Sequence, residues 1–148
     1  MHLPQYRDPS SKQYILPWTR LHALKDYWGM VRVLEEFPQM HATINVVPSL
    51  GAQLEEYASG KFDEPWFSIA FTPADKLSPA DKAEILLRSF QVNRDLLRRW
   101  PRYAELFEWS QRAAPEVIGR TFGQRDWRDL QFLSQLCWMD EEYLAADP

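Results

Sequence analysis

The sequence predicts an α/β fold that is mostly helical and contains one strand without an obvious partner. Two observations lead to this prediction. Apolar residues recur at three- and four-residue steps through most of the chain, as on the buried stripe of an amphipathic helix. Residues 41–47, in contrast, are β-branched or apolar at both parities, which is typical of a parallel strand covered on both faces. A single interior strand cannot pair its own backbone groups, so we expect the chain to be part of a larger parallel domain.

The first eighteen residues contain three prolines and little apolar periodicity, which predicts an extended loop after a short strand end at residues 1–4. Thr19 is the expected cap of a long helix that stops before Pro38. The apolar stripe of that helix consists of Leu21, Leu24, Trp28, Val31, Leu34 and Phe37.

The predicted strand, residues 41–47, has Asn45 as its one strongly polar interior residue and ends at Pro48. Ser49 is placed to cap a short helix that carries Leu50, Leu54 and Tyr57. Gly60 suits the C-terminal stop of that helix, because glycine adopts the left-handed conformation without strain.

Residues 61–77 contain aromatic residues and prolines in no regular order, which predicts an aromatic-rich loop. After it, Ser78, a proline and Asp81 form the capping pattern of a helix that we expect to continue to about Trp100. We expect a further helix from Pro101 to about Ser110, closed by Pro115, and a last helix from about Asp126 to Cys137. These three helices carry most of the apolar residues in the second half of the chain.

Composition limits the classes of partner. The 148 residues are 45% apolar and 14% aromatic, enough for a buried core. A net charge of -4 argues against nucleic acid and anionic membrane surfaces, which require a concentrated basic face. The single cysteine, Cys137, forms neither an intrachain disulfide nor a thiolate zinc site. The sequence shows no secretory signal and no membrane span, so we expect a cytoplasmic protein without a cofactor or metal.

The first fifty residues carry three short motifs: His2-Leu3-Pro4, Arg20-Leu21-His22 and Thr43-Ile44-Asn45-Val46-Val47-Pro48-Ser49-Leu50. They resemble the start of the catalytic domain of the family 57 glycoside hydrolases. The family's first motif is histidine-glutamine-proline, so Leu3 departs from it and the nearest glutamine, Gln5, is displaced by two residues. The resemblance continues more weakly to about Tyr143, through the segments 101–106 and 137–140.

This resemblance implies an incomplete seven-stranded parallel (β/α) barrel, of which residues 1–148 are the N-terminal fragment. Strand-helix units would occupy residues 1–60, and the aromatic loop and helical region residues 61–148. The family cleaves or transfers α-glucan chains with retention, which requires a nucleophile and a general acid-base carboxyl about 5–5.5 Å apart. In the family these are a glutamate and an aspartate on later strands, so both would lie beyond Pro148. The chain alone would then be inactive and need the rest of the domain.

Five residues are candidates for contact with an α-glucan or oligosaccharide substrate. The resemblance places His2 at the mouth of the barrel, where such barrels build their sites, and Asn45 at the end of the second strand. Leu3 cannot make an amide hydrogen bond, so any role of the motif glutamine is either lost or moved to Gln5. Trp18 and Trp66 lie in predicted loops, where exposed indole rings would stack on sugar rings. The plainer interpretations are that His2 is an incidental surface group and that Asn45 only satisfies backbone groups at a strand end.

Other features favour structural roles. The pairs Glu35-Glu36, Glu55-Glu56 and Glu141-Glu142 lie on predicted helix surfaces or ends, where adjacent side chains point in different directions and form no acid-base pair. The three histidines lack the spacing of a zinc site. Two other functions stay open: a noncatalytic helical module that binds glycan or protein, and a degenerate or truncated gene product with exposed strand edges.

Overall fold

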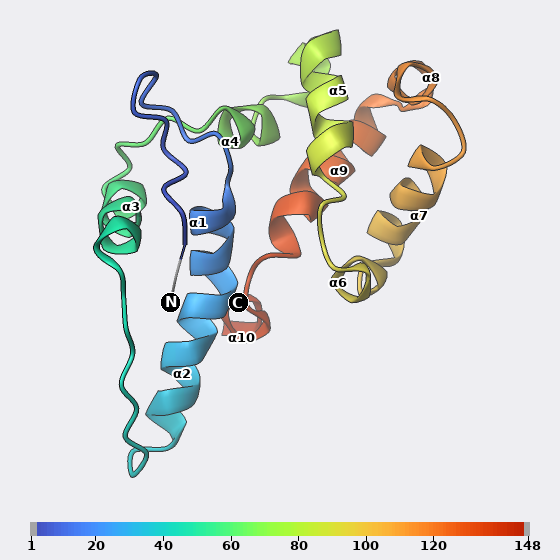
Figure 1. The fold of residues 1–148 in the computed structure, drawn as a ribbon. Coiled ribbons are helices and arrows are strands. Elements are labelled where there is room, and N and C mark those ends of the chain that lie inside the picture. The colour runs from blue at the N-terminus through green and yellow to red at the C-terminus, as the bar shows by residue number, and fades with distance from the viewer. Residues whose placement is uncertain (1–2, 147–148) are drawn as a thin grey trace. The chain divides into compact units, whose positions relative to one another are not determined.

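The computed structural model describes residues 3–146, and in this part of the chain regular structure is entirely helical (Figure 1). The chain divides into two compact units. The first comprises the sequence up to Trp66 together with the segment from Trp138 onward, and the second comprises Phe67–Cys137. A predominance of helix was expected.

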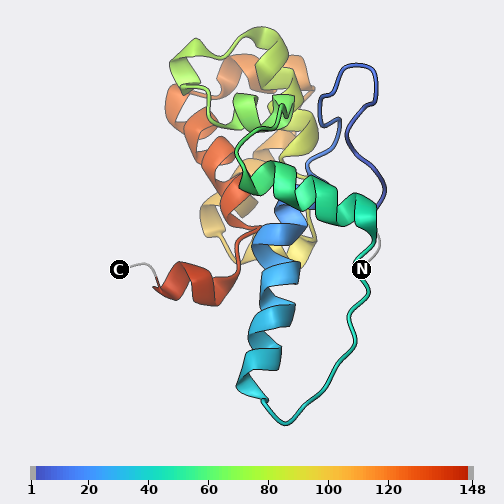
Figure 2. The same ribbon diagram turned by 90° about the vertical axis from the view of Figure 1, so that its left-hand side faces the viewer.

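The first helix of the first unit is one continuous rod in both ribbon views (Figure 1 and Figure 2). It consists of α1 (Trp18–His22), the π-helical turn η1 (Ala23–Tyr27) and α2 (Trp28–Glu36). The prediction of a helix that ends before Pro38 is therefore confirmed. The predicted cap is wrong, because the helix begins before Thr19 and the Thr19 hydroxyl instead bonds to Gln53.

The π-helical turn lies where the C-terminal part of the chain returns to this unit. The Leu24 carbonyl accepts a hydrogen bond from the Asp140 N–H, at 3.1 Å. Gly29 allows this approach, since a Cβ there would lie 3.2 Å from an Asp140 carboxylate oxygen. The short helix α10 (Glu141–Ala146) follows directly. A π-helical turn widens a helix locally, and here it meets the returning segment.

The predicted N-terminal loop is folded back as a tight hairpin. The Ile15 N–H donates to the Tyr6 carbonyl at 3.0 Å, and the Asp8 N–H donates to the Gln13 carbonyl at 2.9 Å. The Asp8 carboxylate accepts the N–H groups of both serines in the turn, which lowers the Asp8 pKa, chiefly through the bond from Ser11. The prediction missed this turn because its stability comes from side-chain bonds to the backbone rather than from apolar periodicity.

The predicted strand at residues 41–47 does not form. Residues 41–46 are all exposed, with Ile44 at 37% and Val46 at 47% of their full accessibility. Among the described residues, backbone hydrogen bonds connect 41–44 to no other segment. The stretch runs as an extended trace from the end of α2 back to the start of the next helix (Figure 1 and Figure 2). A strand needs backbone hydrogen bonds to a neighbouring strand, and residues 41–44 make none with the described part of the chain.

Helix α3 (Pro48–Ala58) follows that stretch and confirms the predicted short helix. Pro48 occupies the first helical position, where its missing N–H costs nothing, so Ser49 lies inside the helix and does not cap it. Gly60 has φ +69° and its N–H bonds the Tyr57 carbonyl, as expected for the C-terminal stop. Leu50 and Gln53 are buried on the inner face.

A buried ion pair joins the first unit together. The Arg20 guanidinium donates to both carboxylate oxygens of Glu64, at 2.7 and 3.0 Å, and Glu64 is 1% exposed. The Tyr57 hydroxyl donates to the same carboxylate at 2.7 Å. Bidentate geometry and a third donor offset the cost of removing the two charges from water. Residues from α1, α3 and the segment before Pro65 thus share one polar centre.

The second unit holds the remaining helices. They are α4 (Pro65–Ala70), which begins in the first unit, η2 (Ala74–Lys76), α5 (Pro79–Arg88), α6 (Arg94–Arg98), α7 (Pro101–Ser110), α8 (Pro115–Thr121) and α9 (Gln124–Leu136).

Two predictions for this region are corrected. Residues 61–77 are not wholly a loop, because α4 and η2 form within them. The helix expected from residue 79 to about Trp100 is interrupted after Arg88, and Asn93 begins the next helix by accepting the Asp95 N–H at 2.9 Å. The Asn93 cap therefore starts a new helix although the apolar spacing is continuous. The predicted capping box of Ser78 and Asp81 is confirmed.

The core of the second unit gathers around α9. Its buried apolar residues are Ala70, Leu77, Ile85, Leu97, Tyr103, Leu106, Ile118, Phe122, Trp127, Leu130, Leu133 and Cys137. Polar bonds add to this packing. The Arg102 guanidinium bonds to Asp126 and Asp129 and so links α7 to α9, and the buried Gln131 amide donates to the carbonyls of Ile69 and Thr72 at 2.8 Å each.

We predict that Glu64→Ala lowers the free energy of unfolding by about 3–5 kcal/mol, because it removes the buried carboxylate that pairs with the Arg20 guanidinium. Glu36→Ala is the matched control, since it removes an exposed partner of Arg32 and should cost at most about 1 kcal/mol. Urea titration of each variant, in the protein that carries the complete catalytic domain, measures both values. Equal losses would show that the buried pair contributes no more than a surface one.

We also predict an alkaline loss of stability. Burial and the Glu64 charge raise the pKa of Tyr57, and burial and the bond to Glu56 raise that of Tyr14. A raised pKa contributes stability that is complete below the unfolded pKa of about 10 and is lost as pH rises through the folded value. The free energy of unfolding should therefore fall above about pH 10, and less steeply in Tyr57→Phe.

Urea titrations between pH 8 and 11 measure this slope. Tyr143→Phe serves as the control, because Tyr143 is exposed and its removal should leave the slope unchanged. If Tyr57→Phe and Tyr143→Phe give the same slope, Tyr57 is not the source of the alkaline sensitivity.

Candidate functional site

The candidate site is built around the N-terminal segment, Leu3 to Tyr6. His2 lies outside the described residues. Gln5 is exposed, and its side-chain oxygen accepts the Arg7 N–H at 3.4 Å. The backbone on either side of Gln5 is held by Gln53 of α3.

Gln53 on α3 makes that backbone connection. Its side-chain oxygen accepts the Tyr6 N–H at 3.1 Å, and its side-chain nitrogen donates to the Pro4 carbonyl at 3.2 Å. The same oxygen accepts the Thr19 hydroxyl at 3.2 Å. Thr19 neighbours Trp18 in α1, so one buried amide connects the segment that carries Gln5 with the helix turn that carries Trp18.

Trp18 begins α1 and is half-buried. Its ring meets the Trp138 ring edge-on at 5.7 Å between centroids, and the His22 ring lies 5.6 Å from Trp138. The His22 ring nitrogen pairs with the Asp26 carboxylate four residues on. The structure therefore places Trp18 in a small aromatic group rather than in an isolated exposed loop.

The other two candidates lie elsewhere. Asn45 is exposed within the extended stretch 41–46. The expectation that Trp66 is an exposed loop residue is wrong, because it lies in α4 and is 5% exposed. The proline before it starts that helix, which the irregular aromatic spacing of the sequence concealed. A ring buried to this extent has no free face for a sugar.

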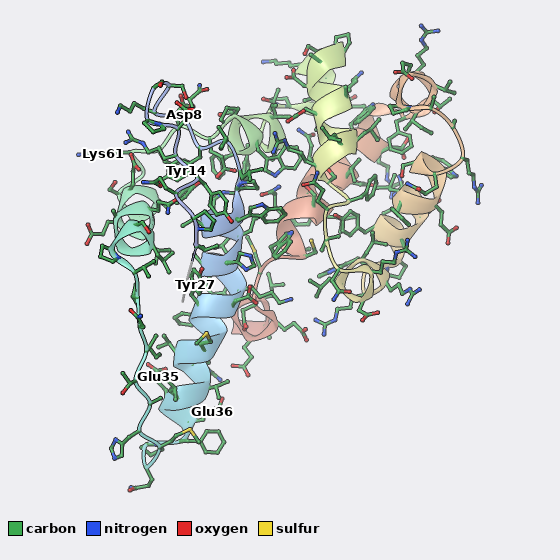
Figure 3. All side chains as sticks on the ribbon, in the orientation of Figure 1. Asp8, Tyr14, Tyr27, Glu35, Glu36 and Lys61 are labelled. Carbon is green, nitrogen blue, oxygen red and sulfur yellow. The ribbon has the colours of Figure 1, made fainter. Side chains whose placement is uncertain are left out.

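The acidic side chains at the N-terminal hairpin and on α2 have structural or surface positions. Glu56 accepts the Tyr14 hydroxyl at 2.7 Å and pairs with Arg7 at 3.1 Å, which fastens the hairpin to α3. Glu35 and Glu36 lie at the end of α2 that is distant from Tyr14 (Figure 3). Both are exposed. These acids are surface or tethering groups, and none forms a close pair suited to acid-base chemistry.

Sequence reasoning missed Gln53 and the buried ion pair. Gln53 stands between Leu50 and Tyr57 at helical spacing, so a polar residue on the apolar stripe of α3 was visible in the sequence. That pattern indicates a buried amide with fixed partners. Arg20 and Glu64 are 44 residues apart, and no local pattern connects them.

The site's chemistry is that of binding. It offers an exposed amide on a fixed backbone and a half-buried aromatic group, both suited to hydroxyl-rich ligands. Within residues 3–146 no cluster of three or more histidine, cysteine or acidic side chains is arranged to hold a metal ion. None of the described helices combines the length and apolar character that crossing a bilayer requires.

Comparison with known proteins gives a family match. The family model described as "Glycosyl hydrolase family 57" matches residues 1–133. No curated protein matches the chain significantly. No solved structure does so either.

Proposed function

Because this chain belongs to glycosyl hydrolase family 57, we propose that it forms the N-terminal portion of a retaining hydrolase or glucanotransferase that acts on α-glucans. The family match supports a carbohydrate substrate. The observation that carries the structural half of the proposal is the exposed stretch 41–46, whose residues have the composition of an interior strand and the environment of a surface loop.

That contradiction is resolved if neighbouring strands complete the fold. In a parallel barrel both faces of a strand are covered and both edges are paired. Ile44 and Val46 would then be buried on one face and the intervening residues on the other. Because Ile44 and Val46 are still 37% and 47% exposed, each would gain roughly 0.5–1.5 kcal/mol from complete burial.

The substrate would be met at the ends of such strands. We assign His2 and Gln5 to contacts with sugar hydroxyls, Asn45 to the end of the second strand, and Trp18 to stacking on a pyranose ring. Gln5 is exposed on a backbone fixed by Gln53, which supports its part in this assignment. Leu3 cannot make the side-chain amide hydrogen bond of the family's glutamine, so Gln5 takes that part.

The reaction itself requires a nucleophile and a general acid-base carboxyl about 5–5.5 Å apart. We place these two groups, a glutamate and an aspartate, beyond Pro148. The role of this chain is then to present substrate contacts and helical scaffolding, and it is inactive without the rest of the domain. Whether hydrolysis or transfer dominates depends on groups outside it.

A second candidate, a noncatalytic module that binds glycan or protein, is favoured by one observation. The two units each have a packed core, and the first contains fully buried residues such as Leu50 and Glu64. Packed cores of this kind favour a chain that folds by itself. Cooperative unfolding of the isolated 148 residues without dye binding would favour this module, and non-cooperative unfolding with bound apolar dye would favour the barrel portion.

We predict that His2→Ala, introduced into the protein that carries the complete catalytic domain, lowers kcat on maltooligosaccharides by roughly tenfold or more, about the effect of one hydrogen bond. The melting temperature should stay unchanged, because a substrate contact adds little to folding. Steady-state kinetics and thermal unfolding measure the two effects.

His41→Ala is the matched control, since it removes a histidine outside the motif and should leave kcat as it is. Unchanged kcat in His2→Ala would remove His2 from the site. Release of sugar by the 148-residue chain alone would show that its own carboxylates are catalytic and would contradict the placement of the pair beyond Pro148.

A further inference from the structure

Gln53 is a buried amide whose hydrogen-bonding capacity is fully used. It is 1% exposed. Its oxygen accepts the Tyr6 N–H and the Thr19 hydroxyl, and its nitrogen donates to the carbonyls of Pro4, at 3.2 Å, and Ser49, at 2.9 Å. Two acceptor sites and two donors are all that a glutamine side chain has. Such complete pairing fixes the amide in one orientation.

The partners determine that orientation. A flipped amide would direct its NH₂ group at the Tyr6 N–H and its oxygen at two carbonyls. Three of the four bonds would then be replaced by repulsive contacts. The amide therefore has a defined direction, with its oxygen toward the Tyr6 N–H and its nitrogen toward the Pro4 carbonyl.

These two bonds lie on either side of Gln5. The Pro4 carbonyl precedes Gln5 and the Tyr6 N–H follows it, so Gln53 holds the backbone across this one residue as a neighbouring strand would. Pro4 has no N–H, and its carbonyl is its only backbone hydrogen-bonding group. Gln5 itself remains exposed.

A residue needed only for packing would not need to be an amide with four hydrogen-bond partners. Burying an amide costs free energy unless its partners are present, and leucine would fill a similar volume on the apolar stripe of α3 without that cost. Only the Ser49 bond is local to α3. The other three reach the N-terminal segment and α1, so the amide serves the connection between elements.

We propose that Gln53 is a positioning residue, which holds the segment Leu3–Tyr6 on α3 and thereby sets the direction in which Gln5 meets the sugar. The inference rests on the proposed function for the sugar contact. The positioning itself is a separate property of the fold, and the two are tested by separate measurements on the same chain.

The first measurement is amide hydrogen exchange by NMR on the 148-residue chain. In Gln53→Leu the Tyr6 N–H loses its acceptor, and its exchange should speed up by roughly tenfold. In Gln53→Glu a carboxylate oxygen would face the Pro4 and Ser49 carbonyls, so exchange at the Tyr6 N–H should speed up there as well. Gln131→Leu is the matched control, because it removes an equally buried amide with two carbonyl partners in the second unit.

Protected amides within α3 show that each variant is folded. Where Gln53→Leu does not fold, Gln53→Met replaces it, since methionine keeps the unbranched shape without the amide. Unchanged Tyr6 exchange in the folded variant would overturn the positioning role. An equal acceleration in Gln131→Leu would also overturn it, since the effect would then be a general loss of stability.

The second measurement is titration of the chain with maltoheptaose, followed by the Gln5 side-chain NH₂ signals. Wild type and Gln131→Leu should shift alike, and Gln53→Leu should require roughly tenfold more sugar. A wild-type chain whose Gln5 signals do not move would contradict the proposed sugar contact, while Tyr6 exchange would still decide the positioning role. Equal titrations in wild type and Gln53→Leu would overturn the claim that positioning matters for binding.

Discussion

A strand that is apolar on both faces is stable only between other strands, and the completed fold of this chain depends on that requirement. The stretch 41–46 has the composition of such a strand, yet its residues are exposed and its backbone is unpaired over 41–44 within the described structure. Hydrophobic burial and backbone pairing both favour adding strands to it. The helices on either side, α2 and α3, are in place without them.

Buried polar contacts hold α1, which continues into α2, against α3. The Arg20–Glu64 pair and the Tyr57 hydroxyl fix α1 to α3 at one end of the first unit. The Gln53 amide adds the N-terminal segment to the same two helices. A buried polar group costs free energy when its partner is missing. These contacts together therefore favour a single arrangement of the N-terminal segment, α1 and α3. The ends of both expected strands, near Pro4 and before Pro48, are thereby attached to one helical frame.

The sequence predicted the elements that depend on local patterns. The helix ending before Pro38, the helix ending near Gly60 and the capping box at Ser78 all follow from spacing and cap chemistry, and all are present. The strand at 41–47 did not form because strands depend on partners rather than on their own residues. The break after Arg88 was missed because the Asn93 cap outweighs the apolar spacing, and the helix at Pro65 because its aromatic residues have no regular spacing.

For the site, the exposed position of Gln5 agrees with its expected role, whereas the burial of Trp66 does not. Gln53 was visible as a polar residue on an apolar stripe, but its partners are 47 and 49 residues away and only the fold reveals them. Contacts across such separations depend on tertiary packing, for which a single sequence contains no direct signal.

Sequencing the genomic DNA on both sides of this coding segment tests the central claim most directly. We expect the reading frame to continue upstream into an apolar strand and downstream into further strands that carry a glutamate and an aspartate. These are the neighbours that residues 41–46 require and the carboxyl pair that the chemistry requires. A start codon preceded by a stop, together with a stop codon directly after Pro148, would contradict the account, because neither the strands nor the carboxylates would exist.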